Sequence, residues 1–174
     1  MQGRNSLRPG CNNKGVMNHT LQNIREDAMN FELSQDHKVL QDAVRDFVKK
    51  EIKPLAVQID EEHAIPDELV RKMSEMGFMG SYLPEEYGGA GLDMLSYAIV
   101  VEEVSKACGS SGVLISAHTS LACGPIYTFG TEEQKKKWLP ALNSGETIGC
   151  FLLTEPDAGS DAGAIATTYR REGD

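Results

Sequence analysis

Cysteines are few in this sequence, and long hydrophobic runs are missing from it. The four cysteines, Cys11, Cys108, Cys123 and Cys150, are widely scattered, with no Cys-x-x-Cys pair and no neighbouring histidines at the spacing of metal ligands. This pattern favours free thiols in a reducing compartment over disulfides or a metal site. No stretch approaches the roughly 18 consecutive apolar residues that a membrane-spanning helix needs. We therefore expect a soluble protein with neither a metal site nor a membrane partner.

Basic residues are also in the minority. The 17 Lys and Arg residues are set against 26 Asp and Glu residues, which gives a net charge of −9. A surface field of this sign repels phosphate backbones and anionic lipid, so nucleic acid is not an expected partner. The 174 residues, 40% of them hydrophobic and 25% charged, have the composition of an ordinary globular protein with a real core.

The first 28 residues lack any helical periodicity. They are polar, rich in asparagine and interrupted by glycine and proline, so residues 1–28 are predicted to form a disordered leader. Their basic residues precede the first acidic residue, Glu26, which is also typical of a mitochondrial transit peptide. We favour a simpler interpretation, in which an upstream or vector-derived extension precedes a natural start at Met29.

From Ser34 onwards the apolar residues recur every three or four positions, as in amphipathic helices. Ser34 is a favourable cap for a first helix. Pro66 suits the first position of a second helix, which Gly77 is expected to end. Asp93 is predicted to cap a third, longer helix. The carboxylates on this long helix, Glu103 among them, are expected to be solvated rather than catalytic.

The next stretch, which begins at Ser110 or Ser111, is apolar on nearly all sides. A helix of this kind must be surrounded by protein, so it is predicted to be the central, most buried helix. Gly124-Pro125 should kink or break it, because proline lacks the amide and clashes with the preceding turn. His118 on this helix is expected to be a satisfied core or pocket-lining histidine rather than a catalytic one. Thr131-Glu-Glu-Gln134 is a capping box that starts a last helix.

The periodicity changes after Gly145. Residues 146–154 are short, apolar and bounded by turn residues, and residues 164–171 are rich in β-branched and aromatic side chains, so both segments are predicted to be strands. The predicted fold class is therefore α+β by segment. An all-α helical bundle domain, 29–146, is followed by the first strands of a truncated β-domain, 147–174.

A candidate site lies in FLLTEPDAGSD, residues 151–161. Pro156 cannot donate to a sheet ladder, so the strand should release its backbone near Thr154 and lead into an irregular loop. Gly159 permits close backbone approach and positive φ, and Ser160 adds a short donor beside it. These features suit a phosphate or the polar edge of a cofactor. A plain turn between two strands explains the same residues equally well.

CFLLTEPDAGSDAGAIATT resembles the signature of the acyl-CoA dehydrogenase family, flavoenzymes that introduce an α,β double bond into acyl-CoA thioesters. The likeness runs from about Met29 to the end. LPEEYGG, VVEEVSKACGSSGVLISAHTSL, GTEEQKKKWLPALNSGE and TEPDAGSD follow in the family's order. SSGVLISAHTSL, FGTEEQKKKWLPAL and SDAGA are most similar to short-chain (butyryl-CoA) dehydrogenases, although glutaryl- and branched-chain relatives share much of this pattern.

The resemblance implies a helical N-terminal domain, a middle β-domain and a C-terminal four-helix domain, with FAD held between them. Backbone groups of Phe151 and Leu153 and the hydroxyl of Thr154 would bond the pyrimidine side of the flavin. Ser160 would meet the CoA arm of the substrate and lie near the FAD pyrophosphate, and Gly159 would let the chain pass close to both. Short-chain acyl-CoA would be oxidised to trans-2-enoyl-CoA in fatty acid β-oxidation or amino acid catabolism.

The same resemblance implies electron-transferring flavoprotein as the electron acceptor and a homotetramer as the usual assembly. The expected location is the bacterial cytoplasm, or the mitochondrial matrix in a eukaryote. The family's catalytic glutamate belongs to the C-terminal domain, so no catalytic residue is expected in this chain, which is interpreted as a fragment inactive alone. The alternative is a non-catalytic helical binding or scaffold protein that kept the fold and lost the chemistry.

Overall fold

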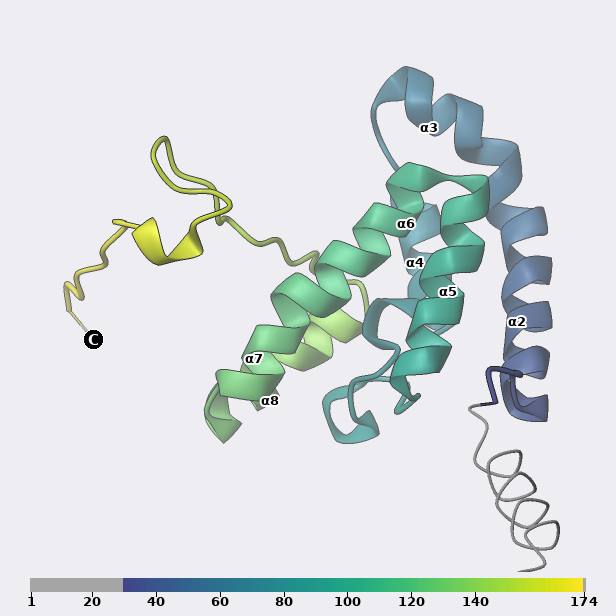
Figure 1. Cartoon of the computed structure of the whole chain (residues 1–174), viewed down its shortest axis with the longest axis horizontal. Coiled ribbons are helices and arrows are strands. Elements are labelled where there is room, and N and C mark those ends of the chain that lie inside the picture. The colour runs from purple at the N-terminus through teal and green to yellow at the C-terminus, as the bar shows by residue number, and fades with distance from the viewer. Residues whose placement is uncertain (1–29, 174) are drawn as a thin grey trace, which may run out of the picture. The chain divides into compact units, whose positions relative to one another are not determined.

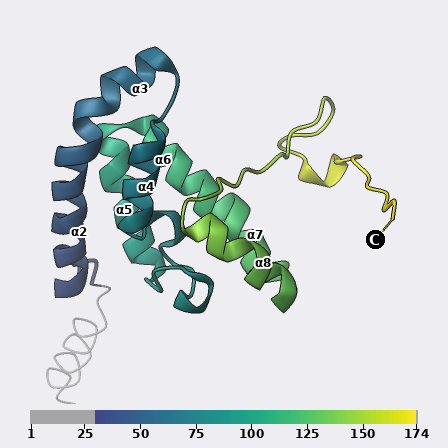
Figure 2. The same cartoon turned by 180° about the vertical axis from the view of Figure 1, so that it is seen from behind.

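The computed structural model describes residues 30–173. The chain divides into two units, Met1–Leu33 and Ser34–Asp174, and the second holds the regular secondary structure of the described residues. The predicted disordered leader, 1–28, lies outside the described residues. The α-helices of the second unit, drawn in Figures 1 and 2, are α2 (Gln35–Phe47), α3 (Ala56–Glu62), α4 (Asp67–Glu75), α5 (Met94–Ala107), α6 (Gly109–Ser116), α7 (Gly124–Phe129) and α8 (Glu132–Asn143). None of the helices within 30–173 is both long and apolar enough to cross a membrane.

The predicted helix starts are confirmed by their capping hydrogen bonds. The Ser34 hydroxyl accepts the third backbone N–H of the first helix, α2, at 3.2 Å. Asp93 accepts the backbone N–H of Ser96 at 2.7 Å in the same way at the start of α5. Thr131 and Gln134 form the full capping box of α8, with bonds of 3.3 and 2.8 Å. Each cap satisfies an amide that the helix leaves open, and such a cap contributes about 1 kcal/mol.

The helix over 67–75 also follows the prediction closely. Pro66 directly precedes α4 as its cap instead of occupying its first position. Gly77 adopts the left-handed conformation, with φ of 74°, just beyond the end of α4. Glycine takes this conformation without the steric penalty that a Cβ brings, so it ends the helix as expected.

The main core lies among α2, α4, α5 and α6. Its members are fully or almost fully buried apolar side chains, among them Val44, Ile52, Leu69, Met73, Phe78, Val100, Val104 and Ile115. Burial of each of these side chains stabilises the fold by roughly 1.5–3 kcal/mol. α5 and α6 approach so closely that a Cβ on Gly112 would lie 2.0 Å from the Ser105 Oγ and 3.0 Å from its Cα. A glycine at position 112 therefore sets the distance between these two helices.

The apolar stretch from 109 to 129 is a rod in three parts rather than a broken helix. α6 continues into the π-helical segment Ala117–Cys123 and then into α7, which begins at Gly124 (Figure 1). Pro125 falls in the first turn of α7, where its missing amide needs no partner within the helix. The backbone stays helical across the junction, so the expected kink or break takes the form of a wide turn.

Gly124 is required at this wide turn. Its N–H reaches back five residues to the Thr119 carbonyl, which also accepts the Tyr82 hydroxyl at 3.2 Å. A Cβ on Gly124 would lie 2.6 Å from that hydroxyl. The glycine thus makes room for a side chain that satisfies a carbonyl of the widened turn.

The prediction that this stretch is the most buried helix is wrong for one of its sides. Ile115, His118, Thr119 and Cys123 are fully buried, but Val113 is 68% exposed and Phe129 is 85% exposed. An apolar composition indicates a surface unsuited to water and does not say what covers it. In residues 30–173 the packed side faces α5, α8 and the turn at Phe78–Gly80, and the side with Val113 and Phe129 is left open.

The two strands predicted at 146–154 and 164–171 are also wrong for this structure. Residues 30–173 contain no strand, and the only ladder contact among them is an isolated antiparallel bridge between Glu155 and Ala158. A strand exists only when a neighbour accepts and donates its ladder hydrogen bonds, and neither segment has such a neighbour here. The helical part of the predicted fold is confirmed, and the β-domain is not seen.

Candidate functional site

The candidate site begins where the chain leaves α8. Gly145 turns the chain with a left-handed φ of 74°, and the Thr147 N–H then bonds the Ala141 carbonyl at 3.1 Å. Two residues later the Gly149 N–H donates to Nδ1 of His118 at 3.0 Å. These contacts hold the start of the segment against the end of α8 and the π-helical segment.

His118 is buried and uses both ring nitrogens. Its Nδ1 accepts from Gly149, so Nε2 carries the proton and donates to the Leu142 carbonyl at 3.1 Å. Burial lowers the pKa of His118, which keeps the ring neutral. The Cys123 Sγ lies 3.4 Å from Nε2, and burial raises the pKa of that thiol to about 12, so it stays protonated. The histidine is a satisfied core residue, as predicted.

The residues predicted to bind the cofactor follow at once. Phe151 is 49% exposed, Thr154 and Ser160 are exposed, and Leu153 and Gly159 are partly buried. Within the described part of the chain, no backbone–backbone hydrogen bond involves residues 150–154. Their amides and carbonyls are therefore free to bind another group. The predicted strand that was to lead into this loop is not formed in this structure.

The loop brings two of the predicted residues together. A Cβ on Gly159 would lie 3.8 Å from Cγ2 of Thr154, so the two residues are in ordinary contact distance. Gly159 does not have positive φ, since the left-handed glycines among residues 30–173 are Gly77, Gly88, Gly91, Gly145 and Gly173. Its contribution is close approach and not an unusual backbone conformation.

Glu155 holds this loop closed, a role that the sequence reasoning missed. Its N–H donates to the Ala158 carbonyl at 2.8 Å, and its carboxylate accepts the N–H groups of Ala166 and Thr167, both at 2.9 Å. Hydrogen bonds from Thr167, and then from the Ala166 backbone, lower the pKa of Glu155. The signal available in the sequence was an acidic residue directly before Pro156, where the loop was predicted to begin.

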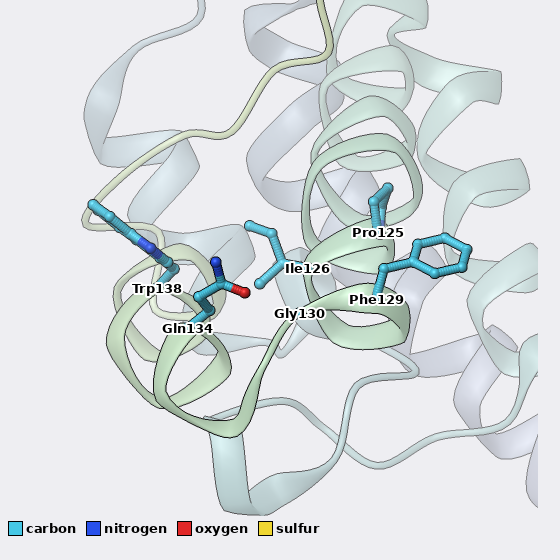
Figure 3. A pocket seen from close by; sticks show the side chains of 6 residues that line it. All are labelled: Pro125, Ile126, Phe129, Gly130, Gln134 and Trp138. Carbon is cyan, nitrogen blue, oxygen red and sulfur yellow. The ribbon is translucent and has the colours of Figure 1, made fainter. Parts of the chain in front are cut away.

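A separate apolar pocket of about 440 Å³ lies between α7 and α8. Figure 3 shows Pro125 and Phe129 on α7, Gln134 and Trp138 on α8, and Ile126 between them. Gln134 contributes the only side-chain amide, and no charged side chain lines the pocket. None of the predicted cofactor-binding residues lies here. The pocket suits apolar surface rather than a phosphate.

The helix carboxylates do not form a reactive cluster. Glu103, expected to be solvated, is only 5% exposed and bonds Arg45 and Lys106, both at 3.0 Å. Burial raises its pKa, but the bonds from Arg45 and Lys106 outweigh that effect and leave the pKa lowered. It is a structural ion cluster between α2 and α5. Within the part of the chain that the structure describes, no group of three or more acidic, cysteine or histidine side chains could hold a metal ion.

Known proteins resemble this chain over the helical unit and beyond it. Residues 34–146 match the family description "Acyl-CoA dehydrogenase, N-terminal domain". The short-chain specific acyl-CoA dehydrogenase of Bos taurus mitochondria is 52% identical over 143 residues, which are 82% of this chain and 35% of the relative. The short-chain specific enzyme of Clostridium acetobutylicum is 51% identical over 146 residues, 84% of this chain and 38% of the relative.

Solved structures share the fold. Butyryl-CoA dehydrogenase from Megasphaera elsdenii has a TM-score of 0.70 at 38% identity, over 77% of this chain and 36% of its own. An acyl-CoA dehydrogenase from Bacillus anthracis, complexed with FAD, has a TM-score of 0.72 at 39% identity, over 78% of this chain and 23% of its own. A chain in a structure of the electron transferring flavoprotein of Acidaminococcus fermentans has a TM-score of 0.73 at 46% identity, over 78% of this chain and 36% of its own.

The matches cover most of this chain but a minor part of each relative. The chain spans about a third of the length of the curated relatives that it matches. The family match extends over the helical unit from its first cap, Ser34, to the residues just after α8. On this evidence the chain belongs to the acyl-CoA dehydrogenase family, of which it carries the N-terminal helical domain.

Proposed function

We propose that this chain is part of an FAD-dependent acyl-CoA dehydrogenase that oxidises short-chain acyl-CoA to trans-2-enoyl-CoA. The observation that carries the proposal is the identity of about one half to short-chain specific enzymes over 143–146 residues. Two curated relatives from distant organisms, an animal and a bacterium, support the same substrate class. The exposed, unpaired backbone at 150–154 supports the proposal from the side of the site.

The residues present fit a flavin edge. The pyrimidine side of a flavin alternates hydrogen-bond donors and acceptors, and an extended backbone with free N–H and C=O groups offers the complementary pattern. Phe151 and Leu153 have such free backbone groups, and Thr154 adds an exposed hydroxyl. In this structure residues 150–154 make no backbone–backbone hydrogen bonds, so these groups are open to a cofactor.

The chain's own residues would bind and orient the cofactor. Bound FAD supplies the acceptor for the hydride that leaves the β-carbon of the substrate. Donors at Phe151, Leu153 and Thr154 would be directed at the flavin edge where negative charge develops. Preorganised donors stabilise such charge more in the transition state than in the ground state, and losing one costs about 3 kcal/mol.

Ser160 and Gly159 are proposed to serve the substrate and the FAD pyrophosphate. Ser160 is exposed, so its hydroxyl can donate to the CoA arm. Gly159 approaches Thr154 with no side chain between them, which leaves room for a cofactor against the backbone. The α-proton would be removed by a carboxylate outside this chain, and no residue of this chain is assigned that role.

Electron-transferring flavoprotein is the proposed electron acceptor, and a homotetramer is the proposed assembly of the whole enzyme. The relation to a chain in the Acidaminococcus fermentans flavoprotein structure supports the first. The bacterial cytoplasm, or the mitochondrial matrix in a eukaryote, is the proposed location. The exposed apolar side of the 109–129 rod and the apolar pocket between α7 and α8 leave surface for further domains or subunits.

A chimaera tests the function directly. Residues 34–173 replace the matching part of the Clostridium acetobutylicum enzyme, and the purified protein is assayed for bound flavin and for butyryl-CoA-dependent reduction of an artificial acceptor. We expect a yellow, active protein that prefers C4 over C16 substrates, with the unmodified relative as reference. A folded chimaera that is colourless and inert contradicts the proposal and favours the alternative, a scaffold that kept the fold without the chemistry.

Substitutions within the chimaera test the flavin contact. Thr154→Val removes one hydroxyl donor and is expected to lower the rate with butyryl-CoA by about 100-fold or more, as loss of one preorganised donor does. Thr168→Val is the matched control. It makes the same change at an exposed position further along the chain, outside the proposed flavin contact, and should leave the rate unchanged. Equal rates for the two variants would remove Thr154 from the site.

A further inference from the structure

We propose that His118 is a positioning residue, which ties the start of the flavin-facing segment, residues 149–154, to the helical domain through the Gly149 amide. The contact itself stands on the geometry of this chain, whereas its importance for flavin binding rests on the proposed function. The histidine would act on the cofactor only through the backbone that it holds.

The imidazole links three parts of the chain. It projects from the π-helical segment Ala117–Cys123, donates through Nε2 to the Leu142 carbonyl in the last turn of α8, and accepts the Gly149 N–H at Nδ1. The ring and its bond to the Leu142 carbonyl are fully buried, and the bond from the Gly149 N–H is partly buried. Bonds of this kind must be made or replaced, since a polar group left unpaired away from water destabilises the fold.

Packing at Gly149 shows that the contact is close on both sides. A Cβ at this position would lie 2.5 Å from the Ala122 Cβ and 3.3 Å from a Leu142 methyl carbon. A side chain at 149 would therefore push the segment away from the histidine. The glycine and the imidazole together fix one point of the backbone two residues before Phe151.

This point is the last tether before the proposed flavin contacts. Upstream, the Thr147 N–H bonds the Ala141 carbonyl, and downstream no backbone–backbone bond within residues 30–173 is made until Glu155. Without the histidine bond the nearest upstream tether moves back by two residues, which adds about 7 Å of free chain. The positions of Phe151 and Thr154 would then vary more. A cofactor site needs its contacting residues held within a fraction of an ångström, so cofactor binding would weaken.

Two substitutions separate the two bonds of the histidine. His118→Asn places an acceptor near the position of Nδ1 and loses the donor to Leu142, whereas His118→Gln reaches the position of Nε2 and loses the acceptor for Gly149. If His118 positions the segment, the Gln variant releases Gly149 and the Asn variant retains it. A histidine that only fills the core would give two variants of similar behaviour.

The test uses the 174-residue chain and amide hydrogen exchange. In the Gln variant we expect exchange of the Gly149 amide to accelerate at least about fivefold, the factor that one hydrogen bond of about 1 kcal/mol gives, and in the Asn variant to stay near the original rate. Thr119→Val is the matched control, because it removes a buried bond on the same turn, to the Met79 carbonyl, without touching the segment. It should leave Gly149 exchange unchanged.

Nitrogen-15 spectra of the imidazole give an independent readout. We expect the neutral tautomer with hydrogen on Nε2, since Nδ1 is the acceptor. A proton on Nδ1, or Gly149 exchange that is unchanged in the Gln variant, would overturn the proposal. These measurements need no flavin, so a colourless chimaera would refute the proposed function and leave the His118 contact standing, whereas unchanged exchange beside an active chimaera would refute the contact alone.

Discussion

Gly112 offers a decisive test of the packing between α5 and α6. Alanine is intrinsically better than glycine in the interior of a helix by roughly 1 kcal/mol, so propensity alone predicts that Gly112→Ala stabilises the protein. The structure predicts the opposite, because the new Cβ would meet Ser105 at 2.0 Å from Oγ, 2.9 Å from Cβ and 3.0 Å from Cα. Rotation of the exposed Ser105 hydroxyl removes the first contact but not the other two.

The balance of these effects sets the expected magnitude. Overpacking a well-packed site costs typically 1–3 kcal/mol, and contacts with a Cβ and a backbone carbon lie at the upper end of that range. After the gain in propensity is subtracted, Gly112→Ala should lose about 2 kcal/mol of unfolding free energy. For a chain of this length that loss lowers Tm by on the order of 6 °C.

Urea and thermal unfolding, followed by circular dichroism, measure the change. Gly109→Ala in the same helix is the control, because nothing lies within 4 Å of a Cβ there, and it should be neutral or up to about 1 kcal/mol more stable. In a double-mutant cycle, Ser105→Gly should recover part of the loss. A Gly112→Ala protein as stable as the original would refute the close approach of the helices.

Two further predictions concern the core and the loop. Ile115→Ala removes a fully buried side chain and should lower the unfolding free energy, measured in urea, by about 2–5 kcal/mol. Val113 is 68% exposed on the same helix, so Val113→Ala should change it by no more than about 0.5 kcal/mol. Equal losses would contradict the assignment of Ile115 to the buried side and Val113 to the exposed side. The lowered pKa of Glu155 means that its loop closure is fully present above the ordinary glutamate pKa, about 4.3, and is lost as pH falls through the lowered value. Protection of the Ala166 amide, that is, the slowing of its exchange relative to the intrinsic rate at the same pH, should accordingly fall in that acidic range, and Glu155→Gln should lower this protection already at neutral pH. An amide whose protection is indifferent to both changes would rule out the closure.

The helix starts could be predicted from the sequence because their causes are local. At Ser34, Asp93 and Thr131 a side chain accepts the amide of a residue three positions on, and nothing distant in the chain needs to be known. The end of α4 at Gly77 has the same character. In each case one residue type and one hydrogen bond, or one backbone conformation, decide the outcome.

The strands and the buried helix depended on neighbours that local patterns do not reveal. Residues 146–154 have the composition of a strand but no ladder partner in this structure. The 109–129 rod is apolar on nearly all sides, yet only one side is covered. Composition indicates which surface is apolar, but only the packing of other parts of the molecule determines whether that surface is buried.

At the candidate site, too, some features could be predicted from the sequence and others could not. The exposed position of Thr154 and Ser160 agrees with a loop that begins near Pro156, which the missing amide of proline made predictable. Their roles toward a flavin remain predictions. The contact of His118 with Gly149 joins residues 31 positions apart and depends on the path of the chain around α8, so no sequence pattern indicated it.

The π-helical segment has a further consequence for the register of the rod. In an α-helix each residue advances by about 100°, so side chains five positions apart, such as His118 and Cys123, would point about 140° away from each other. The wider turn needs more residues for each revolution, and here both side chains reach the same interior, with Cys123 3.4 Å from the ring. Removal of one residue between 117 and 123 would rotate everything after it by roughly a quarter of a revolution or more, and α7 would present a different surface to α8.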